Sequence, residues 1–285
     1  MGREQVLERE RRWARPAGYA AILIAPLYIA SLFILTSTVT FGGLATEQLR
    51  VADANAGVLM LSSLLNALAA LLMCIPLLYL FKAAQARSDR VSQAMVGFVF
   101  IGPVLLALRS LLSAVSQNQI ASDFVAQASP GGDIYTLLDD LAEASTVAEV
   151  AGSLFFPAVL GLVVAMVYIS LQAMRVGLVS RFFGTLGMAL GGALVVIAPQ
   201  LSLLAIAIWM GWLGFIYLDR VPRGRPPAWV AGEAIPWPKP GEQVPEPAAD
   251  VIEGDATEAF AASADSADNA ARRQRARKKK RKRRG

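Results

Sequence analysis

Six long apolar stretches, separated by short polar segments, dominate the first 218 residues of the chain. They lie at residues 17–40, 56–82, 93–115, 148–174, 182–198 and 200–218. An apolar helix of about 20 residues crosses the ~30 Å hydrocarbon core of a bilayer, and in lipid a helix satisfies its own backbone hydrogen bonds. The pattern therefore predicts an all-α fold, a polytopic membrane bundle of six transmembrane helices over residues 17–218.

The connecting segments alternate in charge. Lys82, Arg87 and Arg90 precede the third stretch, Arg175 and Arg181 flank the link before the fifth, and Arg220, Arg223 and Arg225 follow the sixth. Residues 1–16 add five arginines, whereas the remaining connections hold one arginine, Arg50, among several acids. An excess of Lys and Arg marks the cytoplasmic side of a membrane protein. We therefore predict that both termini are cytoplasmic.

The segment at residues 116–147, between the third and fourth stretches, keeps a helical pattern. Pro130–Gly132 interrupts that pattern, and Asp133 follows as a candidate helix N-cap. Ile134, Leu137, Leu138 and Leu141 then recur at helical spacing. The sequence predicts a helical hairpin that extends from the outer face of the membrane.

Arg109 is the one ionisable residue deep within a predicted span. Such a residue is costly in lipid, so it raises a functional hypothesis. Asn66 and Glu149 are predicted at a similar height and are its candidate partners. Two interpretations stay open. Arg109 binds an anion in an outward-facing cavity of a transporter or sensor, or it is a structural residue that is paired or extends to the interface.

Residues for common catalytic and metal chemistry are scarce. The chain has no histidine and a single cysteine, Cys74, so the usual general base and the commonest metal ligand are missing. No phosphate-binding loop, nucleophile elbow or zinc motif occurs. We expect no cofactor and no catalytic or metal site. An enzyme acting on lipid through carboxylates at the membrane faces is a third functional hypothesis.

The fifth stretch carries small residues at helical spacing. Gly184, Gly187 and Gly191 give it a smooth face, with Gly187 and Gly191 four residues apart, and small residues let membrane helices approach closely. We expect a tight antiparallel pair of the fifth and sixth spans. The same face is an alternative interface for a homo-oligomer.

Residues 219–271 are rich in proline and acids and predict a disordered linker. A polybasic tail occupies residues 272–285, and its eleven basic residues are Arg272, Arg273, Arg275, Arg277, Lys278, Lys279, Lys280, Arg281, Lys282, Arg283 and Arg284. The tail is suited to anionic lipids. Alternative partners are RNA or the ribosome, an acidic protein, and the chain's own acidic linker.

Two short motifs resemble a bacterial family. They are Arg15-Pro16-Ala17-Gly18-Tyr19 and Arg175-Val176-Gly177-Leu178-Val179-Ser180-Arg181. Over residues 11–218 the chain is similar to six-span inner-membrane proteins that are classified as a domain of unknown function. The resemblance implies six helices in the bacterial cytoplasmic membrane and assigns no functional residue. The leading functional hypothesis is a non-enzymatic membrane scaffold or tether, with the basic tail as its cytoplasmic contact.

Overall fold

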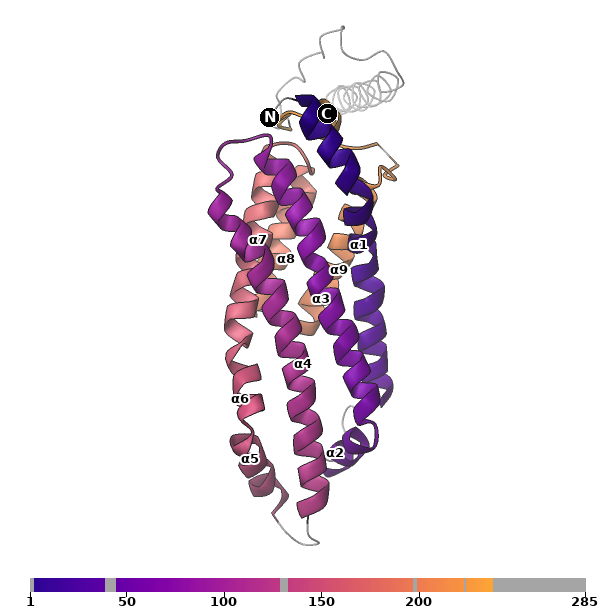
Figure 1. Cartoon of the computed structure of the whole chain (residues 1–285), viewed down its shortest axis with the longest axis vertical. Coiled ribbons are helices and arrows are strands. Elements are labelled where there is room, and N and C mark those ends of the chain that lie inside the picture. The colour runs from indigo at the N-terminus through magenta and orange to yellow at the C-terminus, as the bar shows by residue number, and fades with distance from the viewer. Residues whose placement is uncertain (1–2, 39–44, 129–132, 197–198, 223, 238–285) are drawn as a thin grey trace, which may run out of the picture. The chain divides into compact units, whose positions relative to one another are not determined.

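The computed structural model describes residues 3–38, 45–128, 133–196, 199–222 and 224–237, which belong to one compact unit. This part of the chain is helical apart from its connections (Figure 1). Its elements are α1 (Arg3–Thr38), α2 (Ala45–Ala54), α3 (Ala56–Gln85), the 3-10 turn η1 (Gln93–Met95), α4 (Val96–Gln127), α5 (Ile134–Ala144), α6 (Thr146–Ser153), α7 (Phe155–Arg175), α8 (Arg181–Val196), α9 (Pro199–Tyr217) and α10 (Pro227–Ala231).

Five helical segments are long and apolar enough to cross a membrane. They are Arg3–Thr38, Ala56–Gln85, Gln93–Gln127, Thr146–Arg175 and Pro199–Tyr217. The sixth apolar helix, α8, has only 16 residues. The chain is thus an all-helical protein with five candidate membrane-spanning helices in its described part.

The long helices form a closed ring in which each packs against its two neighbours. Going round the ring, α1 contacts α3, α3 contacts α4, α4 contacts α7, α7 contacts α8, α8 contacts α9, and α9 returns to α1. The N-terminus of α1, the α3–α4 and α7–α8 connections and α10 lie at one end, here called the α10 end. Helices α2, α5 and α6 lie toward the other, the α5 end (Figure 1).

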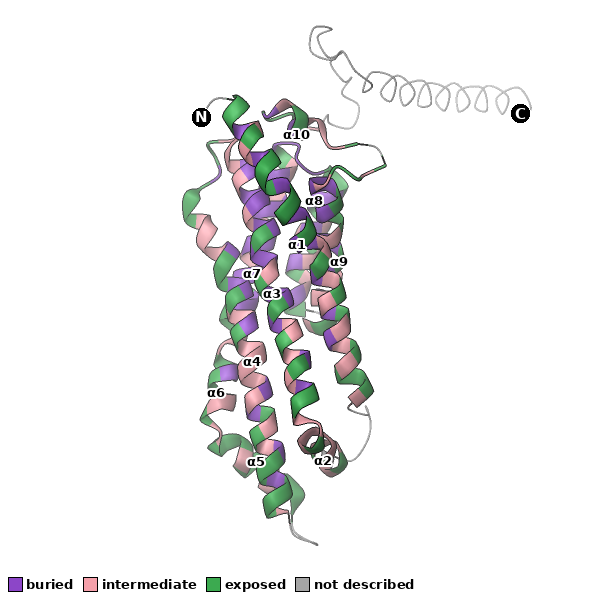
Figure 2. Ribbon diagram, turned by 45° about the vertical axis from the view of Figure 1, so that its right-hand side comes forward, coloured by how far each residue is buried: buried purple, intermediate pink, exposed green. Residues whose placement is uncertain are grey.

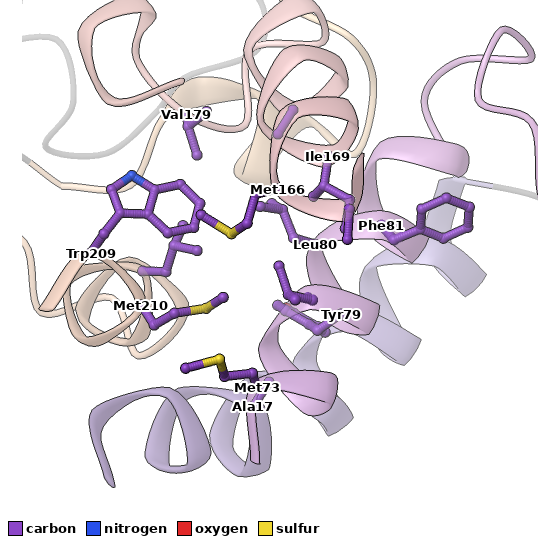
Figure 3. Packing of buried hydrophobic residues seen from close by; sticks show 14 of the residues in the cluster. Ala17, Met73, Tyr79, Leu80, Phe81, Met166, Ile169, Val179, Trp209 and Met210 are labelled. Atoms are coloured by element: carbon purple, nitrogen blue, oxygen red, sulfur yellow. The ribbon is translucent and has the colours of Figure 1, made fainter. Parts of the chain in front are cut away.

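The hydrophobic core lies mainly in the half of the bundle next to the α10 end (Figure 2). Met73 of α3, Met166 of α7 and Met210 of α9 meet near its centre and are almost completely buried (Figure 3). Flexible methionine side chains fill irregular gaps between helices. Toward the α5 end, buried residues are sparser along the same helices (Figure 2).

Backbone-to-backbone contacts at glycines set two of the helix crossings. A Cβ atom on Gly102 of α4 would lie 2.4 Å from the Leu162 nitrogen of α7. A Cβ atom on Gly214 of α9 would lie 2.7 Å from the Gly18 carbonyl oxygen of α1. Only glycine allows helices to approach this closely. Neither crossing had been predicted.

Helix α8 pairs antiparallel with α9, as predicted, but its glycine face packs chiefly against α7. Cβ atoms on Gly184 and Gly191 would lie 2.7 Å and 2.9 Å from the Cβ atoms of Met174 and Met166. Gly187 alone also reaches α9, where its added Cβ would lie 2.6 Å from the Trp209 ring. The three glycines therefore serve packing within the chain.

Replacing Gly102 with alanine should lower the free energy of unfolding by about 1–3 kcal/mol, because the methyl group meets α7 backbone that cannot move aside locally. Thermal unfolding in detergent micelles measures the loss. The matched control is Gly192→Ala on α8, where an added Cβ would meet nothing within 4 Å. Equal melting temperatures for the two variants would show that the α4–α7 crossing tolerates a side chain.

Candidate functional site at the α10 end

The segment that follows α9 folds back across the α10 end, and residues 226–237 are here called the cap. Pro227 begins α10, a position where the missing N–H is not needed. Gly232 ends the helix in the left-handed conformation, with φ of 70°. Within the cap, Ala228 and Trp229 are buried.

The cap corrects the predicted linker. The sequence predicts a disordered linker over residues 219–271, but this prediction is wrong for the cap, which packs against the bundle. Its prolines start a helix, and its tryptophans supply the burial that the surrounding sequence lacks. Residues 238–271 and the basic tail at 272–285 lie outside the described residues.

Two tryptophans hold the cap to the α7–α8 connection. The indole N–H of Trp229 donates a hydrogen bond to the Leu178 carbonyl, at 2.8 Å. The indole N–H of Trp237 donates to the Val179 carbonyl, also at 2.8 Å. Because tryptophan combines a large apolar ring with one donor, each residue contributes burial and a directed bond.

Backbone contacts align the cap with the same connection. The Ile235 N–H donates to the Val176 carbonyl at 3.2 Å, and Arg181 donates to the Trp237 carbonyl at 2.7 Å. Gly177 has φ of 80°, and a Cβ atom there would lie 1.9 Å from the Ile235 carbonyl oxygen. Glycine is therefore required at this position for both reasons.

Three aromatic rings join the cap to the bundle. Trp229 stacks on Tyr79 with ring centroids 5.5 Å apart, and Tyr217 lies edge-on to both rings. The Tyr79 hydroxyl donates to the Glu10 carbonyl at 3.1 Å, and the Tyr217 hydroxyl donates to the Pro76 carbonyl at 3.1 Å. All three rings are buried with their polar atoms satisfied.

A buried ion pair lies beside these rings. The Arg87 side chain is 0% exposed and that of Glu10 is 7% exposed. Arg87 pairs with both carboxylate oxygens of Glu10, one through Nη1 and the other through Nη2 at 2.9 Å. It also donates to the carbonyls of Ala83 and Ala228, and its guanidinium lies 5.5 Å from the Trp229 ring. Arg87 thus links α1, α3 and the cap.

Arg225 is a second arginine next to the cluster. It donates to the carbonyls of Ile216 and Tyr217, which are among the last residues of α9, and its guanidinium lies 5.5 Å from the Trp229 ring. The final carbonyls of a helix have no partner within it. Arg225 satisfies two of them and places a second cation next to Trp229.

Arg109, the predicted intramembrane site, has a different environment. Its guanidinium lies 5.0 Å from the Phe155 ring, and its Nε is buried without a hydrogen-bond partner. Glu149 is exposed, and within the described residues neither Glu149 nor Asn66 forms an ion pair or hydrogen bond with Arg109. The structure does not join the three candidate residues, and anion binding at Arg109 stays a prediction.

At the α5 end, the predicted N-cap role of Asp133 is confirmed. Its carboxylate accepts hydrogen bonds from the Thr136 hydroxyl at 2.7 Å and from the backbone N–H groups of Tyr135 and Thr136. These bonds, led by the Thr136 hydroxyl, lower the pKa of Asp133. The stabilisation of α5 by the Asp133 carboxylate is therefore present near neutral pH and is lost as the pH falls through this lowered pKa.

Exposed arginines surround the α10 end. They are Arg3, Arg11, Arg12, Arg15, Arg90, Arg175, Arg181 and Arg220. The exposed acids of this end are Glu4, Glu8, Asp89, Asp219 and Glu233. Positive charge is thus in excess where the cap closes the bundle.

Comparison with protein-family profiles, with curated proteins and with solved structures gave no match to this chain. The similarity to six-span bacterial membrane proteins therefore stays a prediction.

Proposed function

We propose that this protein is a non-enzymatic membrane scaffold of six crossing helices, which anchors a basic tail at the cytoplasmic surface of a bacterial inner membrane. One observation carries the proposal. Trp237, the last described residue, is held at the α10 end by its hydrogen bonds with Val179 and Arg181. The chain therefore continues toward the tail from the end of the bundle that carries the exposed arginines.

The path of the chain supports α8 as the sixth crossing. Helix α7 ends at the α10 end, whereas α9 begins far from it (Figure 1). Between them, α8 runs antiparallel to α9: Trp209 donates to the Phe183 carbonyl near the start of α8, and Ser202 donates to the Ala193 carbonyl near its end. At 1.5 Å per residue, α8 is about 24 Å long, somewhat less than the ~30 Å core.

The distribution of charge supports the orientation. Excess arginine marks the cytoplasmic side, and the exposed arginines gather at the α10 end. With that end in the cytoplasm, the start of α1 and the attachment point of the tail are on the same side. Glu47, Asp133 and the acids of α5 then face outward.

The composition of the tail favours lipid over RNA as its contact. Each basic residue near an anionic membrane surface contributes about 1 kcal/mol, and residues 272–284 include eleven. That run contains no aromatic residue, although aromatic rings are the usual platform for stacking bases.

The test is capture of anionic vesicles. The full chain, reconstituted in nanodiscs of zwitterionic lipid, should bind vesicles that contain phosphatidylglycerol, and binding should fall at least tenfold between 50 mM and 500 mM salt, on the order expected for multiple charge contacts. Deleting residues 272–285 should abolish capture.

The matched control keeps the length of the tail but replaces its eleven basic residues with glutamine. It should behave like the deletion if charge is responsible. Vesicle capture that persists in both variants would refute the tether. Capture of RNA but not of vesicles would replace lipid with a nucleic-acid partner.

A further inference from the structure

We infer that Arg11, Arg12, Arg15 and Tyr19 of α1, here called the α1 stripe, bind the phosphate headgroup of an anionic phospholipid in the leaflet at the α10 end. This site is separate from the basic tail and belongs to the folded bundle. The inference rests on the proposed placement of the α10 end at a membrane surface, but not on the tail.

The stripe occupies one side of α1. Arg12, Arg15 and Tyr19 recur at helical spacing, and Arg11 lies one turn before Arg15. All four residues are exposed, Tyr19 by 51%. One turn further along, Leu23 is also 51% exposed. The exposed side of α1 therefore changes from apolar at Leu23 to aromatic at Tyr19 and then to cationic toward the N-terminus.

Packing on the other side fixes the direction in which the stripe faces. Glu10, Ala14 and Ala17 are buried against the bundle and its cap. The close contact of Gly18 with Gly214 prevents α1 from rotating against α9. The exposed side of α1 is therefore a fixed feature of the fold.

The length of α1 places the stripe at the headgroups. The helix has 36 residues, or about 54 Å, which exceeds the ~30 Å hydrocarbon core. Residues 19–38 alone are about 30 Å long. If they span the core, Tyr19 lies at its boundary, where tyrosine is enriched. Arg15, Arg12 and Arg11 then lie about 6–12 Å further out, within the headgroup layer.

The charge of the stripe favours an anionic lipid. Arg11, Arg12 and Arg15 form no ion pair within the part of the chain that the structure describes. Glu8, one turn further out on the same side, is exposed and leaves the stripe with a net positive charge. Guanidinium groups bind phosphate through paired hydrogen bonds. A zwitterionic headgroup would add an unfavourable cation next to them.

The experiment uses the full chain in a non-ionic detergent and measures the melting temperature as lipid is added. Phosphatidylglycerol should raise it, and phosphatidylcholine and inorganic phosphate should not. In the triple variant Arg11→Gln/Arg12→Gln/Arg15→Gln, we expect less than half of the phosphatidylglycerol shift. Native mass spectrometry should show a matching loss of retained lipid.

The control variant Arg3→Gln/Arg90→Gln/Arg175→Gln removes the same charge from exposed positions of the same end and should keep the full shift. Equal loss in the two triple variants, or no loss in the first, would overturn the site, as would an equal shift from inorganic phosphate. A chain lacking residues 272–285 should keep the melting-temperature shift even though it no longer captures vesicles. The two measurements therefore test the lipid site on α1 and the tether function of the tail separately.

Discussion

Replacing Arg87 with alanine should lower the free energy of unfolding by about 3–5 kcal/mol, because the Glu10 carboxylate would stay buried without its partner. The Glu10 side chain is 7% exposed and has no other cation within the described residues. The Ala228 carbonyl would also lose both hydrogen bonds that Arg87 donates to it. The cap and the start of α1 would lose their common partner in the α3–α4 connection.

Thermal and denaturant unfolding in detergent micelles measure this loss. Arg90→Ala is the matched control, since Arg90 is exposed three residues away, and such a surface change usually stays within about 0.5 kcal/mol. A double variant, Glu10→Gln with Arg87→Met, removes both charges and should recover much of the stability. Equal stability of Arg87→Ala and Arg90→Ala would contradict a stabilising role for the pair.

The long helices could be predicted from the sequence because apolar length alone decides them. The predicted stretches at 56–82 and 200–218 match Ala56–Gln85 and Pro199–Tyr217 to within a few residues. The start of α1, in contrast, could not be predicted from apolar length. Its charged residues suggested a segment outside the first span, but arginine and glutamate are good helix formers, and α1 continues unbroken from Arg3 through Pro16.

The cluster at the α10 end could not be predicted, because it joins residues far apart in sequence. Glu10 and Arg87 are separated by 77 positions, and Arg87 and Ala228 by 141. Counting charges in connecting segments assigned Arg87 to membrane orientation, and only the fold reveals its buried partners. One feature of the sequence does point to the cap: two tryptophans, Trp229 and Trp237, occur in a segment that is otherwise too polar to fold.

Arg109 and its two predicted partners show the reverse case. Arg109 was correctly recognised as an ionisable residue within a long apolar helix, because its neighbours are apolar. The height of a residue along a helix does not say which way it faces, however. Arg109 stacks on Phe155, while Glu149 is exposed. Similar height was therefore insufficient to predict a pair.

Replacing Trp229 with alanine should lower the free energy of unfolding by about 3–5 kcal/mol, the usual cost of removing a buried aromatic side chain. Trp229 is 3% exposed. It stacks on Tyr79, lies next to both Arg87 and Arg225, and bonds the Leu178 carbonyl. Its loss would detach the cap from the bundle, so limited proteolysis should cleave the cap sooner.

Two further variants separate the contributions of the indole hydrogen bond, the aromatic ring and its burial. Trp229→Phe keeps a ring but removes the N–H donor, and it should cost about 1 kcal/mol from the hydrogen bond to Leu178, with some loss of packing. Trp13→Ala removes the same side chain from an exposed position on α1 and should be nearly neutral. If Trp229→Ala were equally neutral, the cap would not belong to the folded unit. If Trp229→Ala and Arg87→Ala together cost less than their sum, the ion pair and the ring stabilise the same closure.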